Sequence, residues 1–173
     1  MRNNINQPLR IILVIACSTL FSCATILQPG LNPNDAEEFN NRGFARCQTG
    51  HYDQAISDFS KAIKANPRLA PAYNNRGAAY LYKAQYDQAI TDLSKAIEID
   101  PLLAQAYNNR GWAYAKKWQY DRAILDFDKS TEIDPGFMEA YYHRAIVYFH
   151  LEEYDKSWSD VIKAQQLGCE IPL

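Results

Sequence analysis

The chain lacks the local patterns that carry catalysis or hold a cofactor. Its 173 residues include no glycine-rich phosphate loop, no nucleophile elbow and no Cys/His cluster with the spacing of metal ligands. His143 and His150 fall on one face of an expected helix, but at about 10 Å apart they are too distant to share a metal ion. We therefore predict that the protein is not an enzyme and uses no cofactor or metal.

A large excess of charge of one sign is also absent. Lys and Arg number 18 and Asp and Glu number 20, which gives a formal net charge of -2. Proteins that bind nucleic acid need a basic surface to neutralise phosphates, so we predict no nucleic-acid partner. A hydrophobic content of 47% with 22% charged residues suits a folded body rather than a disordered one.

What the chain does contain is a repeat. Segments that start at Ala36, Ala70, Ala104 and Met138 share one pattern with a period of 34 residues, and the last copy is the most divergent. The recurring positions include a small residue in the first half of each copy, a tyrosine near its middle and a proline near its end. They are Gly43, Gly77, Gly111 and Ala145; Tyr52, Tyr86, Tyr120 and Tyr154; and Pro67, Pro101 and Pro135.

With glycine at the eighth place, alanine at the twentieth and proline at the thirty-second, the repeat resembles the tetratricopeptide (TPR) family. The resemblance implies an all-α fold, a solenoid of four helical hairpins wound into a right-handed superhelix. The expected units are 36–69, 70–103, 104–137 and a degenerate fourth copy at 138–168, followed by a tail at 169–173. In the second copy we expect helices over about 70–83 and 87–99.

Aspartates recur where the second helix of each hairpin should begin. Each follows the recurrent tyrosine, and we predict that each provides the N-cap of that helix. They are Asp53, Asp87, Asp121 and Asp155. Asp35 is expected to cap the first helix of the array in the same way.

A second recurring pair departs from the commonest TPR pattern, which has leucine at the seventh place. Here that place holds an arginine, and an aspartate stands sixteen positions later in every copy. The pairs are Arg42 and Asp58, Arg76 and Asp92, Arg110 and Asp126, and Arg144 and Asp160. We predict partly buried ion pairs that join the two helices of each hairpin, and the alternative is a row of arginines that bind phosphate.

In TPR proteins the concave face is lined by particular places of each first helix, and its sixth place here holds an asparagine in three copies. A row of amides could pair with the backbone of an extended peptide, although a solvated helix face inherited with the repeat would show the same row. Aromatic residues at neighbouring places favour a binding groove, because exposed aromatics anchor interfaces. The predicted groove residues are Asn41, Phe44, Asn75, Tyr82, Asn109, Trp112, Tyr142, His143 and Phe149.

The resemblance also allows one specific binding mode to be tested. Chaperone-binding TPR domains clamp a terminal carboxylate with lysines at the fifth and second places and an asparagine at the ninth. The matching residues here are Asn40, Gln105 and Phe44, so this clamp does not carry over. We therefore expect a protein or an extended peptide to be held along its length in the concave groove.

The N-terminal segment resembles a bacterial lipoprotein signal. Residues 1–22 carry Arg2 and Arg10 and then an apolar run from Ile11 to Phe21, which is shorter than the roughly 20 residues that span a membrane. The run ends in Leu20-Phe-Ser-Cys23, so lipid is expected on Cys23, followed by a tether to residue 35. The alternative is an uncleaved N-terminal anchor with an incidental cysteine.

Lipidation at Cys23 predicts a location and a role. Because Ala24 stands where aspartate commonly signals inner-membrane retention, we expect the protein on the outer membrane, facing the periplasm. Its expected role is an adaptor that holds other envelope proteins. The alternative role is an assembly factor, similar to a pilotin, for a secretion or pilus machine.

The end of the repeat array lacks the extra helix that usually covers the last repeat. Trp158, Val161, Ile162 and Leu167 are expected to form a partly uncovered surface. A weak homodimer through this C-terminal helix would cover it, and a folded-back tail with Ile171 and Leu173 is the alternative. Cys47 and Cys169 lie at opposite ends of the array, which excludes a disulfide between them within one chain.

Overall fold

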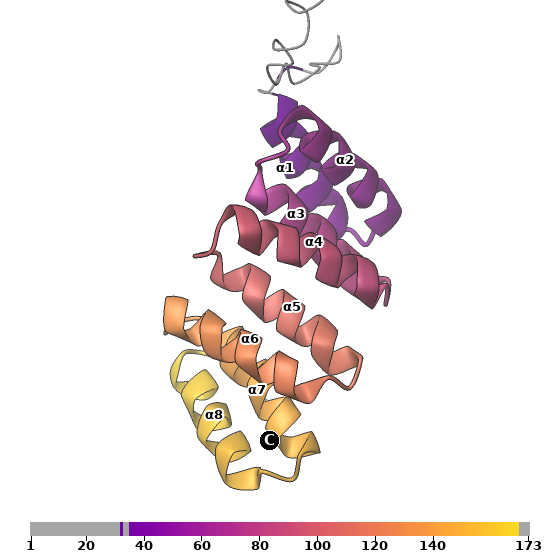
Figure 1. The fold of residues 1–173 in the computed structure, drawn as a ribbon. Coiled ribbons are helices and arrows are strands. Elements are labelled where there is room, and N and C mark those ends of the chain that lie inside the picture. The colour runs from indigo at the N-terminus through magenta and orange to yellow at the C-terminus, as the bar shows by residue number, and fades with distance from the viewer. Residues whose placement is uncertain (1–31, 33–34, 170–173) are drawn as a thin grey trace, which may run out of the picture. The chain divides into compact units, whose positions relative to one another are not determined.

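The computed structural model describes residue 32 and residues 35–169, all of which belong to one compact unit. Residues 1–31, 33–34 and 170–173, which include the signal, Cys23 and most of the tether, lie outside the described residues. The described part is all-α, with eight helices and no strand (Figure 1). These helices are α1 Asp35–Gln48, α2 Tyr52–Ala65, α3 Ala70–Tyr82, α4 Tyr86–Ile99, α5 Ala104–Lys116, α6 Tyr120–Ile133, α7 Met138–His150 and α8 Tyr154–Gln166.

Consecutive helices pair into four hairpins, α1–α2, α3–α4, α5–α6 and α7–α8, and the hairpins follow one another in chain order (Figure 1). The prediction of an all-α array of helical hairpins is confirmed, and the helix ends of the second hairpin agree with the expected ones to within one residue. None of the helices in the described region is both long and apolar enough to cross a membrane.

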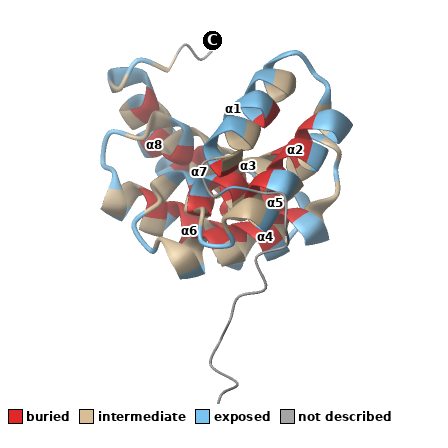
Figure 2. Cartoon of the chain, turned by 90° about the horizontal axis from the view of Figure 1, so that it is seen from above, coloured by how far each residue is buried: buried red, intermediate tan, exposed pale blue. Residues whose placement is uncertain are grey.

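Small residues set how closely the two helices of a hairpin approach. Gly77 in α3 is buried, and a Cβ atom added to it would lie 2.7 Å from Cγ of Leu93 and 3.3 Å from the carbonyl oxygen of Ala89. Gly43 and Gly111 meet Phe59 and Phe127 in the same way. The buried residues lie on the helix faces that meet each other (Figure 2). The core of the described part consists of three clusters, each shared by two neighbouring hairpins, rather than a single central cluster.

The prediction that aspartates cap the second helices is wrong. The N-cap residues of α2, α4, α6 and α8 are His51, Gln85, Gln119 and Glu153, and none of them makes a side-chain capping hydrogen bond. Each recurring aspartate lies one residue inside its helix, in the first turn, where its charge still complements the positive end of the helix dipole. Asp35 likewise begins α1 rather than preceding it, and its carboxylate accepts a hydrogen bond from the backbone N–H of Asn32 at 3.0 Å.

Two of these aspartates connect neighbouring hairpins instead. The ammonium of Lys83 at the end of α3 donates a hydrogen bond to Asp53 in α2, and Lys117 after α5 donates to Asp87 in α4. Both lysines are about 30% exposed, whereas both aspartates are more than 80% exposed. At these two places the aspartate therefore serves a contact between hairpins, which local sequence patterns do not reveal.

The face of α8 at the end of the array carries exposed apolar side chains. Trp158 is 61% exposed and Ile162 is 40% exposed, while Val161 and Leu167 are half-buried. The equivalent of Trp158 one repeat earlier is Ile124, which is half-buried where the next hairpin packs against α6. Two of the four residues expected to be uncovered are thus exposed among the described residues.

Candidate functional site

Each arginine at the seventh place of a first helix contacts the aspartate sixteen residues later. Arg76 donates to the two carboxylate oxygens of Asp92 at 2.6 and 2.8 Å, and Arg110 donates to Asp126 at 2.8 Å twice. The pairs that include Arg42 and Arg144 have the same two-bonded geometry, with distances of 2.7 to 2.9 Å. The structure thus brings all four expected pairs together.

These pairs belong to the framework of the hairpins. The side chains of Asp58, Asp92, Asp126 and Asp160 are at most 9% exposed. A third bond reaches back to the preceding hairpin, from Arg76 to Ser60 at 3.0 Å and from Arg110 to Ser94 at 3.1 Å. The hydrogen bonds from Arg42 lower the pKa of Asp58, which stays ionised. Because most of their guanidinium N–H groups already donate to buried carboxylates, the arginines have few donors left that could bind phosphate.

A groove of about 690 Å³ runs across the first helices of all four hairpins, and we refer to it as the groove. It is lined by Phe44, Cys47, Gln48, Tyr52, Phe59, Asn74, Asn75, Ala78, Tyr82, Gln105, Asn108, Asn109, Phe137, Glu139 and His143. No lysine or arginine is among these lining residues, and Glu139 is the one carboxylate. Burial raises the pKa of the Cys47 thiol, which keeps it protonated and weakly nucleophilic.

Five of the nine residues expected in the groove line it. They are Phe44, Asn75, Tyr82, Asn109 and His143. Trp112 stacks on His143 with ring centroids 4.5 Å apart, and it lines a separate, smaller cavity of about 140 Å³. Asn41, Tyr142 and Phe149 do not line the groove. Asn41 is exposed, Tyr142 packs against His143, and Phe149 packs edge-on against Tyr154.

The four asparagines that line the groove are joined with Asn40 into one hydrogen-bonded row. Between hairpins, Nδ2 of Asn75 donates to Oδ1 of Asn40 at 3.0 Å, and Nδ2 of Asn109 donates to Oδ1 of Asn74 at 3.1 Å. Within a helix, Asn74 donates to Asn75 at 3.2 Å and Asn108 donates to Asn109 at 3.5 Å. We call these five side chains the amide row. From Asn108 to Asn40, each amide N–H donates to the next member of the row, so the row runs in one direction toward the N-terminal hairpin.

His143 ends the amide row on the side of the fourth hairpin. Its Nδ1 lies 2.9 Å from Oδ1 of Asn108, and because a carbonyl oxygen can only accept, Nδ1 carries the hydrogen. Burial, with a contribution from the charge of Lys116, lowers the pKa of His143 to about 4. The imidazole is therefore neutral near pH 7, and Nε2 retains a lone pair.

The predicted row contained only the asparagines at the sixth place. Asn74 and Asn108, at the fifth place, are 5% and 3% exposed and connect the sixth-place amides to each other. The signal for them was the repeated Asn-Asn pair. The shift of one hairpin against the next decides which asparagine of each pair faces the neighbouring hairpin. The spacing of residues along the chain does not determine that shift.

Family models match three overlapping or adjacent stretches of the chain. A "TPR repeat" model matches residues 45–83, and two "Tetratricopeptide repeat" models match residues 70–101 and 104–137. The chain is a tetratricopeptide repeat protein. A comparison with curated proteins found no match at a significant level.

Several solved TPR structures have the same fold. MamA from Desulfovibrio magneticus RS-1 is 26% identical, with a TM-score of 0.68 over 78% of this chain and 76% of that one. The TPR domain of Arabidopsis OM64 is 29% identical, with a TM-score of 0.67 over 69% of this chain and 98% of that domain. The second TPR domain of human RPAP3, solved in complex with the HSP70 peptide SGPTIEEVD, is 27% identical, with a TM-score of 0.64 over 67% and 98%.

Proposed function

We propose that this TPR protein is an adaptor that binds an extended segment of a partner protein along the groove. The observation that supports the proposal is the amide row on the floor of the groove. Asn75 and Asn109 each use one N–H and accept one hydrogen bond within the row, so each keeps one donor and one acceptor position for a ligand. An extended backbone presents alternating N–H and C=O groups that suit this pattern.

Aromatic rings at one end of the groove supply the apolar contacts that such binding needs. Phe44 is 52% exposed and Tyr82 is 71% exposed, and the ring of Tyr82 stacks on that of Tyr52 with centroids 5.0 Å apart. Rigid aromatic side chains of this kind provide much of the free energy at protein interfaces. The RPAP3 domain, which shares the fold, holds a peptide, and this supports peptide binding here.

We propose further that the peptide is held along its length and not by its C-terminal carboxylate. None of the residues that line the groove carries a positive charge, so nothing there pairs with a terminal carboxylate. Glu139 would repel one. The neutral amides instead favour a ligand segment of low charge.

The groove is tested by selecting peptides from a displayed random library and measuring the affinity of the binders for variants. Asn109→Ala should weaken binding by about 1 kcal/mol, because it removes hydrogen bonds made by a groove amide. Tyr82→Ala should weaken it by about 2 kcal/mol through loss of an aromatic anchor. Asn41→Ala is the matched control at the same place of the first hairpin, outside the groove, and should leave the affinity unchanged. If all three variants bind equally well, peptides bind elsewhere.

We also propose that lipid on Cys23 anchors the adaptor to the periplasmic face of the outer membrane. The support is the order of basic residues, apolar run and cysteine in residues 1–23. Metabolic labelling with an alkyne fatty acid should mark the wild-type protein but not Cys23→Ala, and the variant should keep its N-terminal segment. Cys47→Ala is the control and should be labelled normally. Equal labelling of the wild type and Cys23→Ala would refute lipidation at this cysteine.

A further inference from the structure

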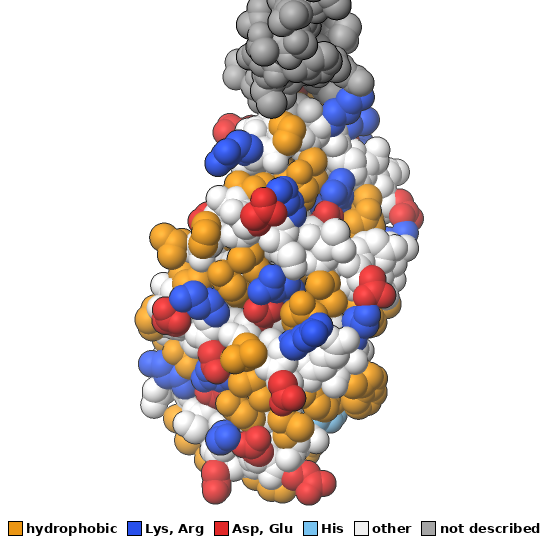
Figure 3. Space-filling model, in the orientation of Figure 1, with side chains coloured by type: hydrophobic (Ala, Val, Ile, Leu, Met, Phe, Trp, Pro, Cys, Tyr) orange, Lys and Arg blue, Asp and Glu red, His pale blue; other side chains and the backbone are white. Residues whose placement is uncertain are grey.

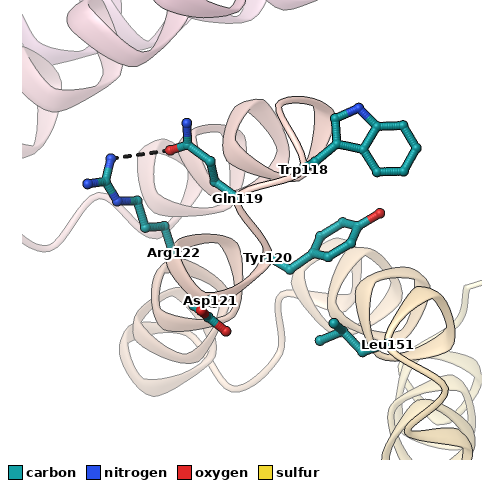
Figure 4. Close-up of a pocket in the computed structure, with 6 residues that line it drawn as sticks. All are labelled: Trp118, Gln119, Tyr120, Asp121, Arg122 and Leu151. Atoms are coloured by element: carbon teal, nitrogen blue, oxygen red, sulfur yellow. Dashed lines mark hydrogen bonds between the residues drawn. The ribbon is translucent and has the colours of Figure 1, made fainter.

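A second cleft lies at the edge of the array, between the third and fourth hairpins, and we call it the edge cleft. It has a volume of about 480 Å³ and is lined by Trp118, Gln119, Tyr120, Asp121, Arg122 and Leu151. Figure 4 shows the rings of Trp118 and Tyr120 projecting to one side of the turn before α6, with Leu151 approaching from the next hairpin. The groove shares none of these residues.

The repeat supplies an internal comparison for this edge. At the two earlier junctions a lysine from the following hairpin fills the corresponding position, Lys83 on Asp53 and Lys117 on Asp87. At the third junction the matching carboxylate is Asp121, but the residue in the lysine position is Leu151. No hydrogen bond or ion pair joins the Asp121 side chain to another residue in the described part of the chain. The edge cleft therefore contains a carboxylate that lacks the ammonium its two equivalents have.

Tryptophan is an unusual choice at position 118. The residue near the end of each turn between paired helices has a positive φ, 76° at Gly50, 56° at Ala84, 61° at Trp118 and 62° at Glu152. A bulky side chain is disfavoured in this left-handed region, where glycine is accommodated freely. Trp118 is nevertheless 75% exposed, so burial of its ring does not compensate for the strain. The positive φ belongs to the turn that all four hairpins share, so the exposed aromatic ring, and not the backbone, distinguishes position 118.

The rings and the carboxylate together suit a cation. Trp118 lies edge-on to Tyr120 with centroids 6.1 Å apart, and the ring of His150 stacks on one face of Tyr120 at 6.0 Å. The 75% exposed ring of Trp118 is therefore the main aromatic surface that a ligand can reach. Aromatic faces attract an ammonium group, and an adjacent carboxylate adds direct charge pairing. The remaining positive groups nearby are occupied, since Arg122 donates to Gln119 at 3.2 Å and lies over the ring of Tyr114, and Lys117 is bound to Asp87.

We propose that the edge cleft binds a lysine side chain of a partner polypeptide, which pairs with Asp121 and lies against Trp118 and Tyr120. The ligand would thus provide from outside the ammonium that Lys83 and Lys117 provide within the chain. Charged side chains of both signs are mixed over the face drawn in Figure 3, so recognition rests on this local pairing and not on a broad charged field. The site is separate from the groove and stands if the groove proposal fails.

The test uses the peptide Ac-Gly-Lys-Gly-NH2 as probe and the indole N–H signals of the three tryptophans in NMR spectra as readout. The signal of Trp118 should shift saturably, with a dissociation constant of about 1 to 10 mM, whereas that of Trp158 on α8 should not move. The same peptide with an Nε-acetylated lysine lacks the charge and should bind about tenfold more weakly.

Three variants separate the parts of the site. Asp121→Asn should weaken binding about tenfold by removing the charge. Leu151→Lys should do the same, because its own ammonium can occupy Asp121 as Lys83 occupies Asp53. Gln166→Lys adds the same charge on α8, outside the edge cleft, and should bind normally. Trp118→Gly removes the ring without strain, since Gly50 shows that glycine fits this position. Because the variant also lacks the indole signal, its binding is followed through the backbone amide signal of Asp121, and it should be about tenfold weaker. Circular dichroism of each variant checks that the helices remain.

The proposal is overturned by any of three results. In the first, the Trp118 signal does not respond up to about 50 mM probe, which is well above the expected dissociation constant. In the second, the acetylated and unmodified peptides bind equally well. In the third, Leu151→Lys binds the probe as tightly as the wild type does. Because the probe is too short to span the groove, these results leave the groove proposal unaffected. Failure of the peptide-library experiment would likewise leave the edge cleft unaffected.

Discussion

The acid sensitivity of the fold should depend on His143. Its folded pKa of about 4 lies below the value near 6.5 of an unfolded histidine. The unfolded chain therefore takes up a proton at higher pH than the folded one, and stability falls as the pH is lowered. Between pH 7 and pH 5 the unfolded histidine becomes almost fully charged while the folded one stays neutral, which costs about 2 kcal/mol. The loss levels off below pH 4, at about 3 kcal/mol.

The variant His143→Asn isolates this contribution. Asparagine already stands at the sixth place in the other hairpins, and Asn109 shows that its Nδ2 can donate to the preceding hairpin as His143 does. The variant loses the stacking of His143 on Trp112, so its absolute stability differs, but the titrating group is gone. Other ionisable groups, including Asp58, are common to both proteins and cancel in the difference.

Urea unfolding followed by circular dichroism at pH 7, 6 and 5 measures the effect. The stability of the wild type relative to His143→Asn should fall by about 2 kcal/mol over this range. Stability curves that remain parallel for the two proteins would show that His143 is accessible to protons in the folded state, and the description of a neutral imidazole at the end of the amide row would then be wrong.

Three further predictions concern the framework. Arg76→Leu should lower the free energy of unfolding by about 3 kcal/mol, because it leaves the buried carboxylate of Asp92 without a partner. Adding Asp92→Tyr should recover most of this loss. Strictly additive effects of the two changes in urea unfolding would show that the side chains do not interact. Gly77→Ala should cost about 1 to 3 kcal/mol because the new Cβ would lie 2.7 Å from Leu93, and an unchanged unfolding midpoint would show that the helices can separate freely. If the exposed face of α8 forms a weak homodimer, sedimentation should show self-association that Trp158→Gln abolishes, and a monomer at all concentrations would exclude it.

The sequence predicts the hairpins well because the signals for them are local. Prolines and small residues recur at fixed places, and helix ends depend on residues within a few positions of each other. The Arg76–Asp92 pair could also be predicted, since two opposite charges recur together at one spacing. The capping prediction failed because each second helix begins at the tyrosine before the aspartate, as at Tyr52 before Asp53, and a shift of one residue moves the side chain from the cap into the first turn.

The binding surfaces were harder to predict because they depend on how hairpins are offset. Asn109 meets Asn74 across a separation of 35 residues, one more than the repeat period, so the row crosses from the sixth place to the fifth. The edge cleft arises where Leu151 replaces a lysine, and in the sequence this substitution looks like ordinary divergence of the last repeat. Only the three-dimensional structure shows that this substitution leaves Asp121 in an open cleft.

The common direction of the amide row has a consequence for the entropy of binding. A lone surface asparagine has two nearly equivalent amide orientations and must settle on one when a ligand arrives. In the row, reversing Asn74 would break its bonds to both Asn75 and Asn109, and the fixed N–H of His143 opposes reversal at the end. The pattern of donors and acceptors on the groove floor is thus set when the hairpins fold. A peptide that matches it loses only its own freedom on binding, since the receptor is already ordered.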